Sequence, residues 1–466
     1  MKANSRSTAR LNRHGTTESD LTVEERPLPV EERLLQLLQH LGIEQAHFAG
    51  GPAWFLWYLH RNMPPHIVSS MTGFFLPPAL PHPDALSDLR PLAGRLLTFF
   101  GERGPVATEE QQRFRESLPG TTAVIFRDYF SPFWADVVAD RTKEIGDAML
   151  EFLARIDQEQ ESTAAPLAEG EGEVAGISYR IQGSGPPLVL LPLGLAPSQW
   201  EPLLPRLSEH YCAITLGGEI GWVRILEKRG RTPGWLRVVG NLIDQILLRP
   251  GESVLDVGCG TGVYDRWLAH RTGRANRVTG LDINGYLLRE AAALVRKEGL
   301  EGVVEFRQGS ADALPFPDNS FDVTMTVGVM AEVDADRMLA EMARVTKPGG
   351  RVAVITFAFD VPSWMNLPLS AELKTKVETT GGRGVVTERG CADASLYRRF
   401  HQAGLVQVSM FLQLCTQLFT EQIEREAPMY LSREERDAYR EAVDQAEAEG
   451  TAFIAFPLHC AVGTKP

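Results

Sequence analysis

The stretch Ser253-Val254-Leu255-Asp256-Val257-Gly258-Cys259-Gly260-Thr261-Gly262 decides how the chain folds. Its apolar residues predict a short buried strand, and the glycines that follow predict a tight turn into a helix. Because glycine has no side chain, a ligand can lie against the main chain at such a turn. The glycines run G-x-G-x-G, and Val263 stands where a dinucleotide-binding turn would place its last glycine. The stretch therefore predicts a strand-turn-helix unit that holds a small polar cofactor.

A second apolar run, residues 277–283, ends in an acid that suits a ribose. Asp282 follows the glycine turn by about 20 residues, the distance at which a carboxylate reaches ribose hydroxyls in nucleotide sites. Three further segments follow in order: Gly309-Ser310-Ala311-Asp312-Ala313-Leu314-Pro315-Phe316, Asp318-Asn319-Ser320-Phe321-Asp322-Val323 and Arg344-Val345-Thr346-Lys347-Pro348-Gly349-Gly350-Arg351-Val352.

Together these five segments resemble the motifs of class I S-adenosylmethionine (SAM) dependent methyltransferases, in the quinone-methylase-like, type 11 branch. Several segments in the right order between Trp235 and Gly463 are more specific than one glycine loop. Strand and helix signals alternate from 253 to 357, which predicts an α/β fold with a Rossmann-like, doubly wound parallel sheet. Residues 406–412 and 452–462 are expected to add a closing antiparallel pair. The resemblance implies SAM as the cofactor.

The resemblance also implies a partner for each part of SAM. Asp282 is expected to bind the ribose, with helix capping as its alternative role, and Ile283 and Leu314 to enclose the adenine. Relatives often carry Asp directly after the motif glycine, where this chain has Ser310, so the adenine amino contact stays open between Ser310, Asp312 and the backbone of Ala311. The expected cofactor-binding residues are Asp256, Gly258, Cys259, Gly260, Thr261, Gly262, Asp282, Ile283, Ser310, Ala311, Asp312 and Val327. Cys259 is expected to be a small filler rather than a reactive thiol.

Candidate catalytic residues are few, because methyl transfer needs a base only when the acceptor must lose a proton. Glu332 follows the fourth strand, where relatives often carry His, and is the first candidate; its alternative role is at the start of a helix. Tyr264 and His459 are weaker candidates. No metal site is expected, because the cysteines Cys212, Cys259, Cys391, Cys415 and Cys460 contain no C-x-x-C pair.

Composition limits the class of partner. The 466 residues suit two to three domains, and 44% hydrophobic with 23% charged residues are typical of a soluble globular protein. A net charge of -13 argues against a nucleic-acid partner. The most apolar run, Pro187–Leu195, is too short to span a bilayer. We expect a small, hydrophobic or aromatic methyl acceptor, no membrane span and a cytoplasmic location; a homodimer is compatible with the sequence.

The chain divides by composition into four parts. Residues 1–28 predict a disordered tail and residues 29–218 a second domain with an exposed linker at 157–174. Residues 219–248 predict a helical lead-in that covers the cofactor. Residues 249–466 predict the methyltransferase domain, with an insert at 358–390 that we expect to act as a lid over the acceptor.

The domain expected over residues 29–218 carries a resemblance of its own. Residues 179–192 resemble the opening strands of an α/β-hydrolase, and residues 46–54 resemble its nucleophile elbow, in reversed order along the chain. The unit is therefore either permuted or assembled from two truncated pieces. Pro52 occupies the nucleophile position, and residues 123–132, which resemble the stretch before the hydrolase histidine, contain no His. We expect a degenerate, catalytically dead domain kept for packing, dimerisation or shaping the substrate entrance.

Two rival functions remain at this point: a bifunctional hydrolase and methyltransferase, and a SAM-binding scaffold without transfer activity. Arsenite methylation is a weaker alternative suggested by Cys391, Cys415 and Cys460, whose spacings show no thiolate cluster.

Overall fold

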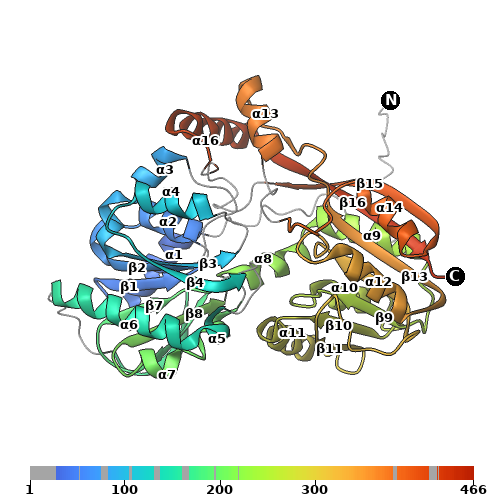
Figure 1. Ribbon diagram of the computed structural model, residues 1–466, viewed down its shortest axis with the longest axis horizontal. Helices are drawn as coiled ribbons and strands as arrows, with labels where there is room; N and C mark the ends of the chain where they lie inside the picture. Colours follow the sequence, from blue (N-terminus) through green and yellow to red (C-terminus); the bar gives the residue numbers. More distant parts are fainter. Residues whose placement is uncertain are drawn as a thin grey trace, which may run out of the picture.

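The computed structural model describes residues 28–51, 53–74, 82–103, 108–130, 137–159, 167–193, 196–218, 220–380, 386–418, 428 and 430–466. The predicted tail lies outside the described residues except for Leu28, and so does Pro52. The chain forms two lobes, coloured blue to green and green to red in Figure 1.

The first lobe is built on one mixed sheet. Its strands are β1 (Ala46–Gly50), β2 (Val68–Phe74), β3 (Leu96–Arg103), β4 (Thr122–Phe130), β5 (Gly170–Val174), β6 (Ile177–Gln182), β7 (Pro187–Leu190) and β8 (Cys212–Gly218). They are ordered β4-β3-β2-β1-β7-β8-β6-β5. Because β1 pairs in parallel with both β2 and β7, the two segments that are distant in sequence share one continuous sheet.

The connections of this lobe are helical. They are α1 (Val30–His40), α2 (Ala53–Asn62), η1 (Pro65–Ile67), α3 (Pro83–Ser87), η2 (Arg90–Arg95), α4 (Thr108–Ser117), α5 (Val137–Asp140), α6 (Thr142–Glu159), η3 (Pro197–Trp200) and α7 (Leu204–Leu207). Residues 197–207 form two short helices rather than one, because Pro202 and Pro205 cannot donate a backbone hydrogen bond. The exposed linker expected at 157–174 is partly wrong, since its two ends belong to α6 and β5 and residues 160–166 are not described.

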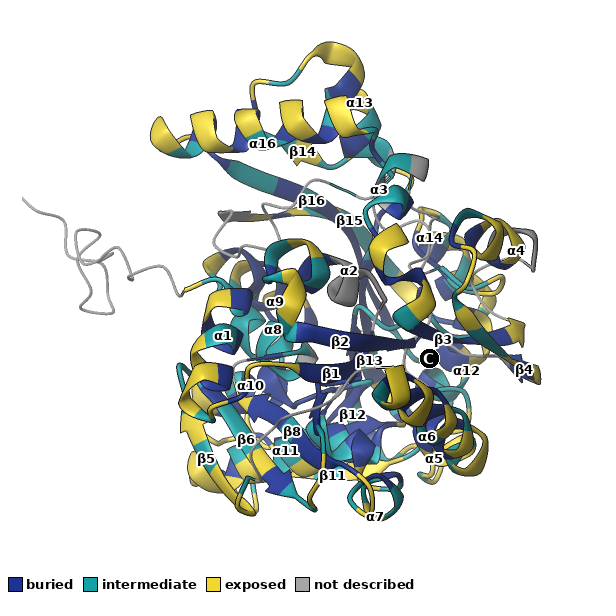
Figure 2. Ribbon diagram, turned by 90° about the vertical axis from the view of Figure 1, so that its left-hand side faces the viewer, coloured by how far each residue is buried: buried dark blue, intermediate teal, exposed yellow. Residues whose placement is uncertain are grey.

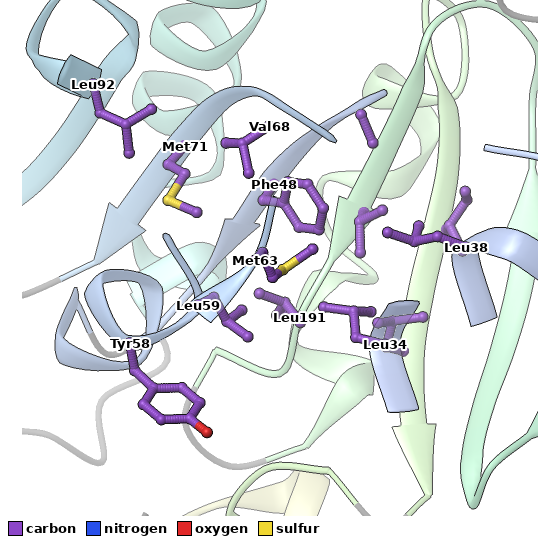
Figure 3. Packing of buried hydrophobic residues seen from close by; sticks show 14 of the residues in the cluster. Leu34, Leu38, Phe48, Tyr58, Leu59, Met63, Val68, Met71, Leu92 and Leu191 are labelled. Carbon is purple, nitrogen blue, oxygen red and sulfur yellow. The ribbon is translucent and has the colours of Figure 1, made fainter. Parts of the chain in front are cut away.

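Apolar side chains cover both faces of this sheet. Leu34, Leu37 and Leu38 place one face of α1 against the strands and are almost fully buried. Figure 3 shows Leu34 and Leu38 near Phe48 and Leu191 in this core. A second cluster on α6 includes Met149, Phe152 and Leu153 and packs with Trp200.

The second lobe contains the doubly wound sheet that the glycine stretch predicts. Its strands are β9 (Val254–Val257), β10 (Val278–Asp282), β11 (Val304–Gln308), β12 (Phe321–Val327), β13 (Thr346–Phe357), β14 (Trp364–Met365), β15 (Val406–Leu418) and β16 (Phe453–Thr464). Strand β9 lies at the centre, parallel to β10 and β12, and β16 runs antiparallel to β13 and β15. The predicted parallel sheet and closing antiparallel pair are confirmed, and Figure 2 shows central strands of both sheets as buried.

Helices α8 (Trp222–Arg229), α9 (Pro233–Ile246), α10 (Val263–Arg271), α11 (Gly285–Lys297), α12 (Ala335–Val345), α13 (Ala371–Thr380), α14 (Ser395–Gln402) and α16 (Arg433–Ala448) belong to this half. Residues 230–232 separate α8 from α9. A Cβ on Gly234 would lie 2.1 Å from the carbonyl oxygen of Thr416, so glycine allows α9 to approach β15 closely.

The insert expected to be irregular is partly structured. Its strand β14 pairs with β16, and its helix α13 shares a small core with α16. The members of this core are Leu367, Leu373, Val377, Leu431, Tyr439, Ala442, Val443, Ala446 and Ala452. Figure 2 shows the outer face of α16 exposed.

Several contacts among the described residues join the two lobes. Helix α8 runs between them (Figure 1), and Ile220 just before it is buried in the first lobe's core. On α16, Arg433 and Arg436 form ion pairs with Asp88, which follows α3. Arg289 and Glu201 form a half-exposed pair with N–O separation 3.0 Å. None of the helices in the described ranges combines the length and the apolar character needed to cross a membrane.

Candidate cofactor and methyl-transfer site

The glycine turn has the backbone conformation that its sequence predicts. Gly258, Gly260 and Gly262 have φ values of 78°, 58° and 67°, which side chains disfavour. A Cβ on Gly258 would lie 2.3 Å from Cγ2 of Val329, and one on Gly262 would lie 2.5 Å from the ring of Phe306. The turn is therefore a close-packed surface that only glycine can form.

Several N–H groups of this turn are already hydrogen-bonded within the protein. Gly258 and Cys259 both donate to the carbonyl of Leu281, at 2.7 and 3.0 Å, and Gly260 donates to Oδ2 of Asp282 at 2.9 Å. These bonds hold the turn against β10. A cofactor at this turn would thus pack mainly against glycine backbone that no side chain covers.

Asp282 is the buried acid at the end of β10. Its Oδ1 accepts the N–H of Asn284 at 2.9 Å, so each carboxylate oxygen already holds one backbone donor and keeps a further lone pair. Burial raises the pKa of Asp282, and the N–H donors of Asn284 and Gly260 oppose that rise. Asn284, not Asp282, caps α11, because its side chain accepts from the N–H groups of Tyr286 and Leu287.

The residues expected around the adenine surround this end of β10. Ile283 is 59% exposed beside Asp282. The Ser310 hydroxyl donates to Oδ1 of Asp312, so these two adenine candidates are already joined. Ala311 is half-buried between them, and Leu314 is buried in the core.

Helix α8 lies over the glycine turn, and this part of the site was not predicted residue by residue. Oε1 of Glu227 accepts from the Thr261 hydroxyl at 2.5 Å, and its Oε2 accepts from Arg266 at 2.5 Å. Cδ1 of Leu226 would lie 3.1 Å from a Cβ on Gly260. Arg266 also donates to the carbonyl of Thr261 at 2.7 Å. The lead-in helix is therefore fastened to the turn that it covers.

Two predicted residues line the inner side of the turn. Burial raises the pKa of the Cys259 thiol well above its usual range, so a neutral filler fits the structure. Val327, the last residue of β12, is buried in the core on the side of Trp235 and Tyr264.

The charge of Arg229, which the sequence interpretation did not single out, acts on both Glu332 and Tyr264. Burial raises the pKa of Glu332 to about 8; the Arg229 charge opposes this rise and the Asp282 charge adds to it. Burial likewise raises the pKa of Tyr264, whose hydroxyl has no hydrogen-bond partner in the described structure. The Arg229 guanidinium stacks 4.8 Å from the ring centroid of Trp235. Arg229 thus supplies a cation, Glu332 a carboxyl that keeps its proton to a higher pH than usual, and Trp235 an apolar surface.

His459 lies apart from these groups. Its Nε2 is 2.7 Å from Oδ1 of Asp360, which ties β16 to the insert. Its strand neighbours Leu458 and Cys460 join the core that contains Tyr264, and alternation along a strand points His459 to the opposite face. His459 thus has a structural partner and lies on the other face of the sheet from Tyr264.

Comparison with known proteins agrees with this site. Residues 255–354 match the family model described as "Methyltransferase domain". The ubiquinone/menaquinone biosynthesis C-methyltransferase UbiE of Hahella chejuensis is 39% identical over 142 residues, 28% of this chain and 57% of that protein. The UbiE of Cronobacter sakazakii is 37% identical over 145 residues, covering 29% and 58%. The chain thus spans a little over half the length of these curated relatives.

Solved structures show weaker likeness. The YcgJ protein of Bacillus subtilis is 20% identical with a TM-score of 0.36, and covers 49% of this chain and 98% of its own. A methyltransferase-like protein of Bacillus halodurans is 18% identical with a TM-score of 0.33, over 49% and 98%.

The fold, the turn and the family match define a class I SAM-dependent methyltransferase domain in the C-terminal half of the chain. Within this class, its sequence relatives are the quinone C-methylating enzymes named above. SAM is the cofactor, and the residues present fit it, because the turn excludes side chains and the Asp282 carboxylate keeps acceptor capacity for hydroxyl donors.

A substitution at Gly258 tests the close packing of the turn. Gly258→Ala is expected to lower stability by several kcal/mol and to weaken SAM binding, because strain of about 1–2 kcal/mol in left-handed backbone adds to a clash with Val329. Gly273→Ala is the matched control, since Gly273 has a φ of 59° but open space around a Cβ. Urea denaturation and calorimetry of SAM binding measure both effects. Equal losses in the two variants would contradict the packing argument.

Proposed function

We propose that this chain transfers the methyl group of SAM to a small, apolar or aromatic acceptor that bears an acidic hydroxyl, such as a phenol or hydroquinone. The observation that carries the proposal is the group of Arg229, Glu332 and Tyr264, in which the Arg229 charge acts on both other side chains. Arg229 stacks on Trp235, whose ring centroid is 5.3 Å from that of Phe456. The similarity to UbiE proteins, named as quinone-pathway C-methyltransferases, supports the same acceptor class.

The residues of the cluster have distinct roles in this proposal. A bound SAM would supply an electrophilic methyl group on a sulfonium. The apolar wall aligns the acceptor for in-line attack, and orientation of this kind provides as much as about 7–11 kcal/mol of barrier reduction. Glu332 takes the hydroxyl proton, because a carboxyl with a pKa near the working pH is an effective base. Arg229 then stabilises the resulting oxyanion electrostatically.

The pH dependence of transfer tests these roles. Because Glu332 accepts a proton only when ionised, kcat/KM is expected to rise with pH up to about 8 and then level off. Glu332→Gln should remove that rise and lower the rate by roughly 10²–10⁴-fold. The measurement is transfer of labelled methyl from SAM to a panel of hydroquinones, phenols and thiols. An unchanged pH profile in the Gln variant would show that Glu332 is not the base, and no transfer to any acceptor would favour the SAM-binding scaffold.

The structure of the insert, whose strand β14 pairs with β16, supports the proposal of a lid over the acceptor. Trp364 of β14 is half-exposed and packs edge-on against Phe453, with ring centroids 5.2 Å apart. We propose that residues 358–380 and 386–390 cover an apolar acceptor.

For the first lobe we propose a permuted, catalytically dead hydrolase-like unit. Support comes from the single sheet that joins β1 and β7, and from the closed turn after β1. A Cβ on Gly50 would lie 2.7 Å from Cβ of Leu191, and one on Gly51 would lie 2.3 Å from the carbonyl oxygen of Leu193. Such packing leaves little room for a substrate at that turn.

A serine, histidine and aspartate do meet in this lobe, but in a buried place. Nδ1 of His47 lies 2.8 Å from Oγ of Ser70, and its Nε2 lies 3.0 Å from Oδ1 of Asp157. Ser70 is fully buried, and both strand residues lie toward the amino ends of their strands. Tyr211 completes the network by donating to Asp157 at 2.9 Å. Hydrolysis of generic esters by the purified chain would contradict the dead-domain proposal and favour the bifunctional enzyme.

A further inference from the structure

Two carboxyl groups lie buried together beneath the glycine turn. Asp256 belongs to β9 and Asp265 to α10, and both are almost inaccessible to solvent. The register partner of Asp256 on β10 is Gly280, whose Cα lies against Oδ2 of Asp265, and this places the two carboxyl groups near each other. Oδ1 of Asp256 and both oxygens of Asp265 have no hydrogen-bond partner among the described residues. Ionising both of these buried carboxyl groups costs electrostatic free energy. One proton shared between them avoids that cost and gives each group a hydrogen-bond partner.

A glycine makes the room for this pair. Gly280 of β10 is the register neighbour of Asp256. A Cβ on Gly280 would lie 2.5 Å from Oδ2 of Asp265 and 2.7 Å from Sγ of Cys259. The Asp265 carboxyl therefore fills the space directly behind the turn that faces the cofactor.

We infer that Asp256 and Asp265 form a proton-sharing pair that releases its proton when SAM binds, and that Asp265 is a positioning residue for the cofactor. This inference rests on the proposed function. The methionine end of SAM brings an ammonium group to the turn. A cation next to the pair favours its doubly ionised form, so binding and loss of the proton are linked.

The surroundings of the pair favour its protonated forms. Burial raises the pKa of Asp265 to about 7, while its interaction with Asp256 and the Arg266 charge oppose the rise. Burial, and then the Asp265 charge, raise the pKa of Asp256 well above its usual range. Arg266 is already bound by Glu227 and Glu298. The remaining nearby groups are Asp282 on β10, the Cys259 thiol in the turn, Tyr264 on α10 and, on α8, Arg229.

Calorimetry of the unmodified chain tests the inference directly. SAM is titrated at pH 6.5 in buffers of different ionisation enthalpy, and release of between half a proton and one proton per SAM is expected. Its affinity should rise by roughly three- to tenfold from pH 6 to pH 7 and level off above pH 8, because one released proton changes affinity by at most about tenfold per pH unit. The neutral analogue methylthioadenosine, which lacks the ammonium, is expected to bind without proton release.

A variant supplies the second test. In Asp265→Asn the amide donates to Asp256 without a titrating proton, so the rise in SAM affinity between pH 6 and pH 8 should be lost. Circular dichroism checks the fold of the variant, and the experiment on the unmodified chain decides the matter if the variant does not fold.

The outcomes separate this inference from the proposed function. SAM binding without proton release, equal release by methylthioadenosine, or a retained pH dependence in a folded Asp265→Asn would overturn the inference alone. Failure of SAM to bind at any pH would overturn both.

Discussion

Asp282→Ala is expected to raise the dissociation constant for SAM by at least tenfold and by about a hundredfold if the turn also loosens. The carboxylate is the predicted ribose acceptor, and it also holds the N–H groups of Gly260 and Asn284. Hydrogen bonds to charged groups contribute about 1.5–3 kcal/mol each, and about 1.4 kcal/mol corresponds to a tenfold change in affinity. Isothermal calorimetry with SAM measures the change.

Asp322→Ala is the matched control for this substitution. Asp322 also accepts hydrogen bonds from the backbone N–H and the hydroxyl of Ser253, at 2.9 and 2.8 Å. It lies at the opposite end of the strands from Asp282, where β9 and β12 begin. Both variants should lose stability, while only Asp282→Ala should lose SAM affinity. Unchanged SAM affinity in Asp282→Ala would refute the ribose assignment.

The central sheet could be predicted from the sequence because its signals are local. Apolar runs ending in the glycine turn or in Asp282 mark the strands, and β10 ends at the predicted residue. The edge strand β5 was missed because its residues are mostly exposed and carry no apolar pattern. Helix α16 was also missed. Its capping box of Ser432 and Glu435 is readable, but its buried face contains several alanines and gives a weak periodic signal.

The site could be predicted only in part, because some of its residues come together through tertiary packing. Asp256, the glycines and Asp282 follow from motif spacing along the chain. Arg229 and Glu227 belong to a helix whose sequence shows only an amphipathic pattern, and nothing local places it over the turn. His459 looked chemically suitable, but strand alternation points it away from Tyr264 and towards Asp360.

Helix α8 also explains how a lobe without an evident site of its own can matter for the cofactor. Ile220 anchors the chain in the first lobe, and a Cβ on Gly221 would lie 2.7 Å from Cβ of Pro192. At its other end a Cβ on Gly230 would lie 2.2 Å from Cγ2 of Val263, at the start of α10. Helix α8, which covers the cofactor site, is thus held at one end by each lobe, and a shift between the lobes would move it.

Glu227→Ala is therefore expected to weaken the contact between α8 and the glycine turn. The change removes the acceptor for Thr261 and one of the carboxylates that bind the buried Arg266, which keeps Glu298. Loss of one partner of a fully buried pair costs about 3–5 kcal/mol, and the partial exposure of Glu227 together with the remaining partner lowers our expectation to about 2 kcal/mol. SAM should bind roughly tenfold more weakly, and amide hydrogens of α8 should exchange faster.

Glu201→Ala is the control, because Glu201 also links the lobes but its pair with Arg289 is half-exposed. Exposed pairs contribute about 0–1 kcal/mol, so this variant should keep its SAM affinity and the exchange rates of α8. If Glu227→Ala matches Glu201→Ala in both measurements, then α8 is not held over the turn by Glu227. If it differs as expected, Glu227 holds α8 over the glycine turn.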